Sequence, residues 1–419
     1  MMARILYSIV VIALLPWALL HLMWRARRQP EYLQHWGERF GFGGAAATSK
    51  PTIWLHAVSV GETRAAQPLV SALRERYPGH RILFTHMTPT GRATSEALYG
   101  DAVERIYLPY DTPWAARRFL RRARPVLGLI METELWPNLI AACRREGVPL
   151  YLVNARLSAR SARRYARFPS LTRSALLGLS GIGAQSIDDA RRLVELGAEP
   201  PSVTGNMKFD AVAPESQLRL AEDFRRLWGQ RHVWLAASTR EGEEALIVDA
   251  WVRAGAGASA LLLLVPRHPQ RVDDVARLVE QRGLSLQRRS ANLPIAPTTR
   301  VVLGDSMGEM FAYYASADLA FIGGSLLDYG SQNLIEAAAC GTPILIGPST
   351  RNFAEAAHAA LAHGAARQVG DADELVRQVL LLLAAAETRQ RMGEAGRAFA
   401  EHHRGATART LALITPEGY

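Results

Sequence analysis

The sequence predicts an α/β protein in which two Rossmann-like domains face a cleft, with a membrane-anchor helix at the N-terminus. Three observations predict this fold: short apolar runs alternate with longer helical patterns, the alternation breaks once near residue 210, and residues 5–23 carry no charge. The 419 residues suffice for two or three domains. A hydrophobic share of 49% and a charged share of 21% are typical of a globular protein with a sizeable core.

The first predicted element is the anchor, over residues 1–28. The apolar run has 19 residues, just enough to cross a hydrocarbon core of ~30 Å. Arg25, Arg27 and Arg28 follow it, and positive charge on this side places the rest of the chain in the cytoplasm. A cleaved signal peptide would carry its charge mainly before the apolar run and a small-x-small site after it, which is not the pattern here. A helix that lies in the membrane interface is the alternative.

The first domain is predicted over residues 29–210. Apolar runs alternate there with helical patterns, such as those over 62–76 and 135–146. This order is typical of a parallel sheet that is covered on both faces. The predicted strands are 52–58, 81–86, 105–108, 126–132 and 150–154.

The second domain is predicted over residues 211–419, after polar residues, Gly205 and Pro214 interrupt the pattern. Its last helical stretch, 387–413, is a candidate to cross back to the first domain. Parallel sheets bind ligands at the carboxyl ends of their strands, so two such domains are expected to face a cleft. This is the outline of a GT-B glycosyltransferase, and an outline alone does not establish function. The predicted strands are 232–237, 260–265, 301–303, 319–323 and 343–346.

The positive charge is concentrated in the first half of the chain. Residues 1–210 carry 28 basic and 16 acidic side chains, whereas residues 211–419 carry 21 and 23. Such asymmetry indicates an anionic partner, and the apolar N-terminus and the lack of a recognisable nucleic-acid module favour anionic lipid over nucleic acid. Solvated helix faces are the alternative. The candidate docking arginines are Arg117, Arg118, Arg121, Arg122 and Arg124, with Arg156 through Arg173.

Glu62 is the first candidate for chemistry. In WLHAVSVGET a buried strand runs into a turn with Ser59 and Gly61, and Glu62 opens a helix. A carboxylate at a strand's carboxyl end can act as a general base, and Ser59 and Gly61 are candidates for further substrate contacts. The alternative is a first-turn acid that complements the helix dipole. The dipole would lower the pKa of Glu62, whereas burial would raise it.

Glu132, Glu134 and Lys208 are further candidates. The two glutamates in METELWPN share a face if the strand persists this far, and could stabilise positive charge on a sugar ring or hold a hydroxyl. Capping of the next helix is the alternative. Lys208 in GNMKFD, one of two lysines, could reach a phosphate or a substrate carboxylate. Its alternative is a solvated linker charge.

In the second half, strand ends offer candidates for anion binding. Arg267 in VPRHPQR follows a very apolar run and could clamp a phosphate, because guanidinium binds phosphate in a bidentate way. A surface loop charge is the alternative. Ser238, Thr239 and Arg240 end another predicted strand and could add anion-binding amides or merely cap a helix.

Two glycine-containing loops complete the candidates. Gly308 in GDSMGEM is expected to begin a helix. In the stretch 321–347 a helix is expected to begin near residue 332, and Gly330, Ser331 and its first amides could cradle a phosphate. Asn333 and Glu336 are three residues apart and would share one helix face, where Glu336 could bind ribose hydroxyls.

No metal site is expected. The one D-x-D sequence, Asp371 to Asp373, precedes a helical pattern and is predicted to supply its N-cap. Cys143 and Cys340 have no partner spacing, which predicts two small apolar residues in helices rather than a disulfide or a zinc ligand set.

Seven motifs together resemble those of the bacterial Kdo transferases, which transfer 3-deoxy-D-manno-octulosonic acid. They are GERFG (37–41), HAVSVGE (56–62), METELWPN (131–138), GNMKFD (205–210), PRHPQR (266–271), GDSMGEM (304–310) and GSQNLIEAA (330–338). They follow in order over nearly the whole chain. The resemblance implies a GT-B fold, a CMP-Kdo donor, a lipid A precursor as acceptor, inversion at the anomeric carbon, and no cofactor or required metal.

The resemblance also implies residue roles. Glu62 falls on the family's catalytic base, and Glu132 and Lys208 fall on positions that support the transition state. Two residues of the donor loop depart from the family pattern: Gln332 stands where a His is usual and Ala337 where a Pro is usual. The residues on CMP-contacting segments are Pro266, Arg267, Met307, Gly308, Glu309, Asn333, Leu334, Ile335 and Glu336.

The expected activity is therefore transfer of Kdo from CMP-Kdo to a lipid A precursor, lipid IVA, by a single-pass protein on the cytoplasmic side of the bacterial inner membrane. A GT-B transferase that uses another nucleotide sugar is one alternative. An inactive, membrane-bound scaffold that binds nucleotide is another, although a scaffold has no need of a base at Glu62.

Overall fold

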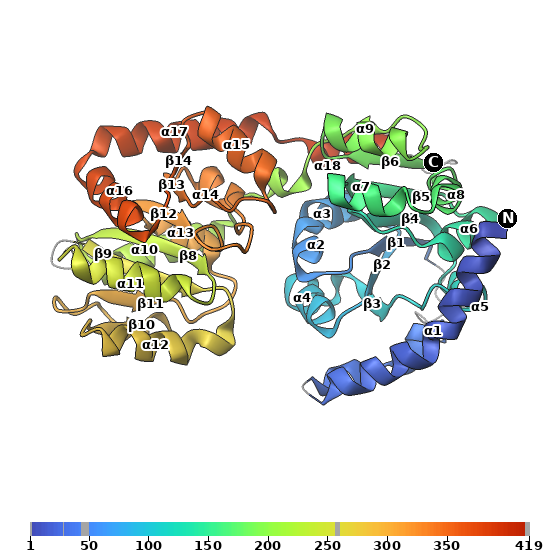
Figure 1. The fold of residues 1–419 in the computed structure, drawn as a ribbon, viewed down its shortest axis with the longest axis horizontal. Helices are drawn as coiled ribbons and strands as arrows, with labels where there is room; N and C mark the ends of the chain where they lie inside the picture. The colour runs from blue at the N-terminus through green and yellow to red at the C-terminus, as the bar shows by residue number, and fades with distance from the viewer. Residues whose placement is uncertain (1, 28, 43–49, 256–259, 415–419) are drawn as a thin grey trace. The chain divides into compact units, whose positions relative to one another are not determined.

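The computed structural model describes residues 2–27, 29–42, 50–255 and 260–414, which divide into two compact units (Figure 1). Unit 1 comprises the residues up to Asp210 and those from Arg404 onward, and unit 2 comprises Ala211–His403. Each unit contains a sheet of seven strands. The prediction of two α/β domains with parallel sheets is confirmed.

In unit 1 every described strand pair is parallel, in the order β3-β2-β1-β4-β5-β6-β7. The chain builds from β1 outward to β3 and then returns to place β4 on the other side of β1. Such a reversal of winding is where doubly wound sheets bind ligands, outside the carboxyl ends of the strands. The strands are β1 (Thr52–His56), β2 (Arg81–His86), β3 (Glu104–Tyr107), β4 (Pro125–Met131), β5 (Leu150–Ala155), β6 (Gly181–Ala184) and β7 (Ser202–Val203).

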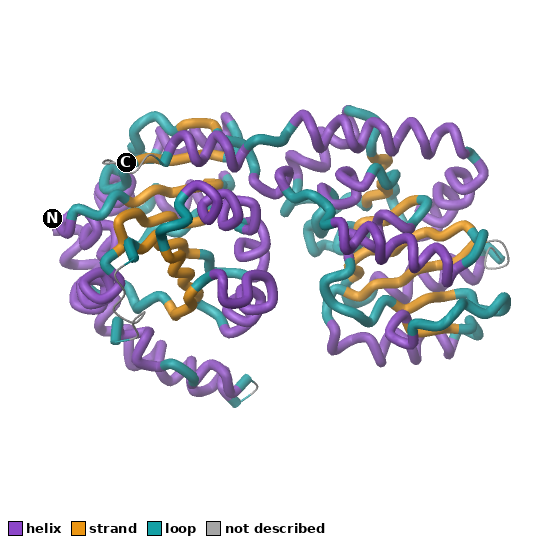
Figure 2. Tube along the Cα trace, turned by 180° about the vertical axis from the view of Figure 1, so that it is seen from behind, coloured by secondary structure: helices purple, strands orange, loops and turns teal. Residues whose placement is uncertain are grey.

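Helices cover both faces of this sheet, as Figure 2 shows from behind. Successive strand residues point to opposite faces, so Ile53 and Leu55 pack with α2, α3 and α4, whereas Trp54 packs with α5 and α6. Trp54 lies against Gly128 of β4, where a Cβ would come within 2.8 Å of the indole. The helices are α2 (Val60–Ala65), α3 (Gln67–Arg76), α4 (Pro89–Tyr99), α5 (Pro113–Ala123), α6 (Pro137–Glu146), α7 (Ala159–Tyr165), α8 (Pro169–Leu176) and α9 (Ile187–Glu195).

Unit 2 repeats this architecture, with parallel strands in the order β10-β11-β9-β8-β12-β13-β14. Its core includes Trp234 of β8 and Trp251 of α11, whose ring centroids lie 5.2 Å apart. The strands are β8 (His232–Thr239), β9 (Ala260–Pro266), β10 (Leu286–Arg288), β11 (Val301–Leu303), β12 (Leu319–Ile322), β13 (Ile344–Ile346) and β14 (Ala366–Gln368). The helices are α10 (Glu215–Trp228), α11 (Glu243–Arg253), α12 (Val272–Gln281), α13 (Met310–Ser316), α14 (Ile335–Cys340), α15 (Ala354–Ala362), α16 (Ala372–Ala384) and α17 (Ala386–His402).

The ten predicted strands are confirmed within about two residues at each end, but several boundaries differ. The predicted helix over 62–76 is two helices, because α2 ends at Ala65 and α3 begins at Gln67 with a proline in its first turn. The helices expected to begin at Gly308 and near Gln332 begin at Met310 and Ile335. Four strands, β6, β7, β10 and β14, are absent from the prediction, because they are short and none of them is a continuous apolar run.

The apolar N-terminal segment forms α1 (Met2–Ala26), which is long and apolar enough to cross a membrane by length and composition. Its first half lies beside α5 and α6 of unit 1, and its second half projects away from the sheet (Figure 1). At its C-terminal end, Leu22 and Ala26 pack on Tyr32 in the short 3-10 helix η1 (Pro30–Leu33). Arg28, one of the three flanking arginines, lies outside the described residues.

The C-terminal stretch is two helices in different units. α17 belongs to unit 2, Gly405 breaks the helix with a φ of 92°, and α18 (Ala406–Leu413) belongs to unit 1. Asp210, at the end of the 3-10 helix η4 (Met207–Asp210), accepts hydrogen bonds from the backbone N–H groups of Gly405 (2.6 Å) and Thr407 (2.5 Å). One carboxylate thus fixes the start of α18 to unit 1.

Replacing Asp210 with Ala is expected to loosen α18 selectively. Hydrogen bonds to a charged group contribute roughly 1.5–3 kcal/mol, so loss of this carboxylate should speed amide exchange in α18 about ten- to a hundredfold. Hydrogen exchange followed by mass spectrometry measures this directly. Asp188→Ala, which removes an exposed carboxylate from α9 in the same unit, is the control and should leave α18 unchanged. Equal protection of α18 in Asp210→Ala and the parent chain would contradict the assignment.

Candidate active site

Glu62 lies at the carboxyl end of β1, in the first turn of α2. Ser59 is the N-cap of α2 and accepts a hydrogen bond from the Glu62 N–H. In return, Glu62 Oε1 accepts a hydrogen bond from the Ser59 hydroxyl (3.0 Å), and Oε2 accepts one from the Val58 N–H (2.7 Å). This reciprocal arrangement resembles a capping box, and Glu62 is a first-turn acid as its structural alternative expected. Gly61 is exposed in the same turn.

Capping does not keep Glu62 strongly acidic. Burial raises the pKa of Glu62 to about 7, and the negative charge of Glu132 adds to the increase. The hydrogen bonds from Val58 and Ser59 and the charge of Lys208 act in the opposite direction, but burial outweighs them. A carboxyl group with a pKa near neutrality meets the requirement for a general base that the sequence could not test.

Glu132 follows β4 in a left-handed conformation, with a φ of 56°. The strand ends at Met131, so the expectation that an extended strand puts Glu132 and Glu134 on one face is wrong. Burial raises the pKa of Glu134 to about 7, and the negative charges of Glu62 and Glu132 raise it further. The Glu132 carboxylate pairs with Lys208, whose Nζ lies 3.4 Å from Oε1. Their exposed fractions, 21% and 17%, show a partly shielded pair, so the solvated linker alternative for Lys208 is wrong.

Asn154, which sequence reasoning did not single out, positions Lys208. This buried residue near the end of β5 has a φ of 52°, and its Oδ1 accepts a hydrogen bond from the Met207 N–H (3.0 Å). Asn206 Oδ1 then accepts one from the Lys208 N–H (3.0 Å). No sequence pattern marks this role, because it depends on η4 returning to the end of β5.

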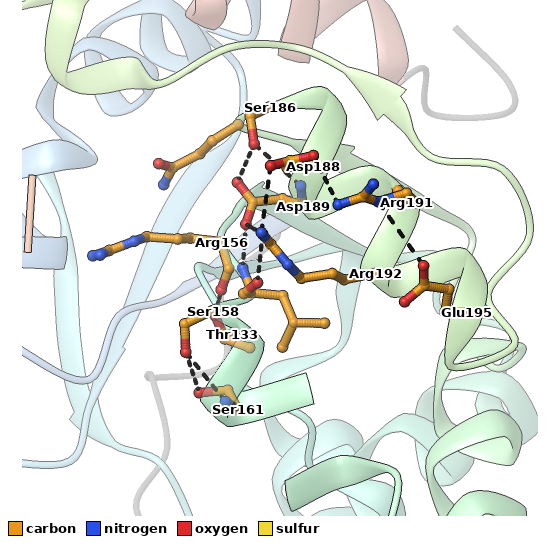
Figure 3. Close-up of polar contacts among 12 residues, drawn as sticks. Thr133, Arg156, Ser158, Ser161, Ser186, Asp188, Asp189, Arg191, Arg192 and Glu195 are labelled. Carbon is orange, nitrogen blue, oxygen red and sulfur yellow. Dashed lines mark hydrogen bonds and ion pairs between the residues drawn. The ribbon is translucent and has the colours of Figure 1, made fainter. Parts of the chain in front are cut away.

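The segment between the two glutamates is also fixed, as Figure 3 shows. The Thr133 hydroxyl donates to the carbonyl of Arg156, just after β5. The next residue, Leu157, donates its N–H to Asp189 (2.7 Å) and accepts from Arg192 (3.2 Å), both on α9. The loop after β4, which carries Glu132 and Glu134, is therefore tied through the residues after β5 to α9.

In unit 2 the basic candidates lie at the carboxyl ends of β8 and β9. Arg267 follows β9, and its Nε donates to the Gln332 side chain (3.2 Å). Arg240 follows β8, contacts His268 (3.1 Å) and lies over the ring of Tyr329. Burial lowers the pKa of His268, and the charges of Arg240 and Arg267 lower it further. This neighbourhood of cations suits an anionic group such as a phosphate.

Three expectations for this region are wrong. The Thr239 hydroxyl is buried and donates to Glu244 (3.0 Å), so it is not exposed to a ligand. Leu334 and Ile335 have no exposed surface and cannot contact a ligand in this conformation. The cradle of loop amides is already occupied: Gly330 N–H donates to Ser349, Ser331 N–H to the carbonyl of Gly324, and Gln332 N–H to that of Gly323.

Asn333 and Glu336 do meet, although Asn333 precedes α14 and does not share a helix face with Glu336. The amide of Asn333 donates to Glu336 Oε1 (3.0 Å). Glu309 is held by Arg289, Ser306 and Tyr313 at 2.7–2.9 Å, which fixes the GDSMGEM loop. Met307 in the same loop is 62% exposed, and Pro266 is buried at the end of β9. Gly308 has a φ of 83° and Ser238 a φ of 54°.

Sequence reasoning also missed Glu243, which organises the loop after β12. This carboxylate has no exposed surface and accepts hydrogen bonds from the N–H groups of Gly324 (2.6 Å), Leu326 (3.0 Å) and Arg240 (2.8 Å). Burial raises its pKa, and these donors limit the increase. It thereby links the loop before Gln332 to the end of β8. In the sequence, Glu243 is only one of two adjacent acidic residues at the start of a helix, and no pattern indicates its role in the loop after β12.

The remaining candidates have structural roles. Asp371 caps α16 by accepting the Glu374 N–H (2.7 Å), as predicted. Cys143 in α6 and Cys340 in α14 are free thiols, also as predicted. Among the described residues no three His, Cys, Asp or Glu side chains form a group that could hold a metal ion.

Comparisons with known proteins identify the family of this chain. Residues 34–211 match the family described as 3-deoxy-D-manno-octulosonic-acid transferase (kdotransferase), and residues 275–399 match glycosyl transferases group 1. The chain is 47% identical to the 3-deoxy-D-manno-octulosonic acid transferase of Bordetella pertussis, over 98% of both chains. It is 39% identical to that of Haemophilus influenzae, over 99% of both. The chain belongs to the Kdo transferase family. It is a glycosyltransferase.

Solved structures support the fold of this Kdo transferase family member. The UDP-GlcNAc 2-epimerase of Neisseria meningitidis has a TM-score of 0.61 over 86% of this chain and 99% of its own, at 14% identity. A glycosyltransferase of Rickettsia africae has a TM-score of 0.58 over 87% and 98%, at 12% identity. At such identities the likeness concerns the fold alone. With two Rossmann-like units, the chain has the GT-B fold.

The raised pKa of Glu62 predicts a pH-dependent stability for this transferase. The folded protein holds a proton on Glu62 up to about pH 7, whereas the unfolded chain releases it near pH 4.3. Stability is therefore expected to fall as pH rises through that window, and Glu62→Gln should remove part of the loss. At about pH 8 the variant should be more stable by roughly 1–2 kcal/mol after solvent screening, with little difference at about pH 4.

Urea unfolding at both pH values measures this difference. Glu75→Gln, which neutralises an exposed glutamate on α3, is the control and should behave like the parent chain at both. A Glu62→Gln variant with the same pH dependence as the parent would show that the Glu62 carboxyl has an ordinary pKa.

Proposed function

We propose that this chain transfers Kdo from CMP-Kdo to a sugar hydroxyl of a lipid A precursor, lipid IVA, with inversion at the anomeric carbon. We place this reaction at the inner face of the bacterial inner membrane, with no role for nucleic acid. The names of the curated relatives support the sugar. The observation that carries the chemistry is a Glu62 carboxyl with a pKa near 7 beside the Glu132–Lys208 ion pair.

The proposed reaction is a single displacement. Glu62 removes the proton from the acceptor hydroxyl, and the resulting oxygen attacks the anomeric carbon of Kdo from the face opposite CMP. As the new C–O bond forms, the bond from that carbon to the CMP phosphate oxygen breaks and its electron pair leaves with CMP. The Val58 N–H and Ser59 hydroxyl hold the two oxygens of Glu62 and orient the carboxylate for this transfer.

Glu132, Glu134 and Lys208 are proposed to act on the charge that develops. A carboxylate such as Glu132 favours positive charge on the sugar ring as the bond to CMP lengthens. Lys208 balances that carboxylate and offers a cation to the acidic sugar or its phosphate. Unit 1, which carries these residues, is proposed to bind the acceptor.

Unit 2 is proposed to bind CMP. Arg267 and Arg240 would bind its phosphate, and both lie at strand ends beside Gln332 or His268. Asn333 and Glu336 would bind the nucleoside from one side, and the Met307–Glu309 loop from the other. Pro266, Leu334 and Ile335 would position these groups, because they are buried. Gln332 already accepts a hydrogen bond from Arg267, so it can orient this arginine where a His is usual in the family.

Transfer from another nucleotide sugar is the second candidate function, because the fold of unit 2 does not determine which sugar the donor carries. Competition between CMP-Kdo and other nucleotide sugars separates the two. The motifs of the chain and its relatives favour CMP-Kdo.

Replacing Glu62 with Gln is expected to lower kcat about 10²- to 10⁴-fold, the usual contribution of a general base. The assay is release of CMP from CMP-Kdo in the presence of a tetraacylated lipid A precursor. In the parent chain, kcat/KM should rise as pH increases through about 7, where Glu62 loses its proton. Mass spectrometry of the product would count the Kdo units added.

Glu75→Gln is again the matched control and should retain full turnover. A folded Glu62→Gln variant as fast as the control would rule out Glu62 as the base. A parent chain that turns over another nucleotide sugar but not CMP-Kdo would favour the second candidate.

Replacing Arg267 with Gln is expected to weaken CMP binding about ten- to a hundredfold, because a hydrogen bond to a charged group contributes roughly 1.5–3 kcal/mol. Isothermal titration calorimetry of CMP with the full chain measures this. Arg253→Gln removes an exposed arginine of the same unit that pairs with Asp373, and should leave the affinity unchanged. Equal CMP affinity in both variants would show that Arg267 does not bind the phosphate of CMP.

A further inference from the structure

α1 is attached to unit 1 through its first half, and by polar groups. The Tyr7 hydroxyl donates to Asp111 Oδ2 (2.9 Å), and the Ser8 hydroxyl donates to Asn138 Oδ1 (2.9 Å). Asp111 is buried and also accepts the backbone N–H groups of Asn138 (3.0 Å) and Leu139 (2.8 Å) at the start of α6. Tyr7 therefore completes the hydrogen bonding of a carboxylate that caps a core helix.

These contacts compete with crossing of the membrane. All 25 residues of α1 would span about 37 Å, more than a hydrocarbon core of ~30 Å. Once residues 4–12 lie against unit 1, the remaining residues 13–26 reach only about 21 Å. A docked α1 is thus too short to cross, and α1 can either dock or span but not both.

Behind the docked helix lies a pocket of about 740 Å³ between α1, α5 and α6. Its wall is strongly cationic: among the described lining residues there are six arginines and a single carboxylate, Glu146. Glu146 already lies near Arg117 (3.4 Å) and Arg121 (3.9 Å). The arginines are Arg4 of α1, Arg117, Arg118, Arg121 and Arg122 of α5, and Arg145 of α6.

The rest of the pocket is apolar. Ile5, Ile9 and Ile12 of α1 line one side, and Trp114 and Phe42 line the other. Outside the pocket α1 also presents apolar side chains to its surroundings, such as Leu6, Trp17 and Leu20, each more than 60% exposed. Guanidinium groups beside an apolar helix fit a molecule whose phosphate enters the pocket while its acyl chains follow the helix.

We propose that this pocket binds the phosphate headgroup of an anionic membrane lipid, and that α1 lies in the membrane interface with its N-terminus on the same side as unit 1. The docked helix revises the expectation of a single-pass anchor. The ligand is a lipid of the bilayer itself, so binding requires neither donor nor acceptor. The lipid site is separate in function from Glu62. The proposed transfer reaction can therefore hold or fail independently of the lipid site.

The first test is flotation of the full chain with vesicles that contain no acceptor. Phosphatidylcholine vesicles are compared with vesicles in which part of that lipid is replaced by phosphatidylglycerol. The parent chain should prefer the anionic vesicles. Because each arginine near an anionic surface contributes about fivefold, Arg117→Gln/Arg121→Gln should lower that partitioning roughly thirtyfold. The double variant Arg122→Gln/Arg145→Gln removes one pocket arginine from α5 and one from α6, and should lower the partitioning to a similar extent.

The matched control is Arg74→Gln/Arg76→Gln. These exposed arginines lie on α3, which packs on the opposite face of the same sheet, so the variant loses the same charge away from the pocket. It should lose only a few-fold in partitioning. An equal loss in control and pocket variants would indicate general attraction and overturn the site, as would no loss in the pocket variants. Binding that appears only when the acceptor lipid is added would also overturn it.

The second test determines the side of the membrane on which α1 begins. Met2 is 86% exposed, so Met2→Cys should react with a membrane-impermeant thiol reagent wherever the reagent can reach it. A docked α1 predicts no reaction in intact spheroplasts and reaction after lysis. The parent chain gives the background from Cys143 and Cys340. Reaction in intact spheroplasts, or none after lysis, would overturn the docked arrangement.

Discussion

The site in unit 1 depends on the parallel pairing of β1 with β4. This pair marks the reversal of winding in the sheet, and it brings together the turn after β1 and the loop after β4, which are about 70 residues apart in the sequence. Glu62 and Glu132 meet there because both follow strands that end at the same edge. Burial at this edge makes the Glu62 carboxyl harder to ionise, and the like charge of Glu132 adds to that effect. The pKa of Glu62 near 7 is thus a consequence of topology as much as of local sequence.

The sequence was sufficient to predict the strands that consist of continuous apolar runs. It was not sufficient where tertiary contacts determine the backbone conformation. Central strands such as β9 are apolar throughout, so they could be predicted within one or two residues. Glu132 and Asn154 have left-handed backbones that no local pattern indicates, since such conformations are uncommon outside glycine. They are held here by contacts with distant segments, Glu132 with β5 and Asn154 with η4. The Glu132–Lys208 pair could be suspected from motifs, but not its geometry.

Unit 2 shows a second limit of sequence reasoning, which is that a motif does not say which of its residues face a ligand. Within one run of the chain, Asn333 and Glu336 form a polar pair, whereas Leu334 and Ile335 between them are fully buried. Loop amides that a glycine-rich pattern offers to a phosphate are used by the fold itself. The cations of Arg240 and Arg267 remain the groups at these strand ends suited to an anion, and Glu243 and Gln332 hold the surrounding loop and arginine in place.

The same reasoning applies to α1, where hydropathy gives the apolar length of a helix but not its partner. Tyr7 and Ser8 are mild interruptions of an apolar run, yet their hydroxyls meet the buried Asp111 and its neighbour Asn138. Removing Tyr7 from Asp111 would leave a buried carboxylate with one donor fewer, which is costly. An apolar helix held by polar groups at one end, over a wall of arginines, is better matched to the boundary between headgroups and acyl chains than to the centre of a bilayer. Such a position would keep unit 1 at the membrane surface, where the proposed lipid acceptor would be within reach.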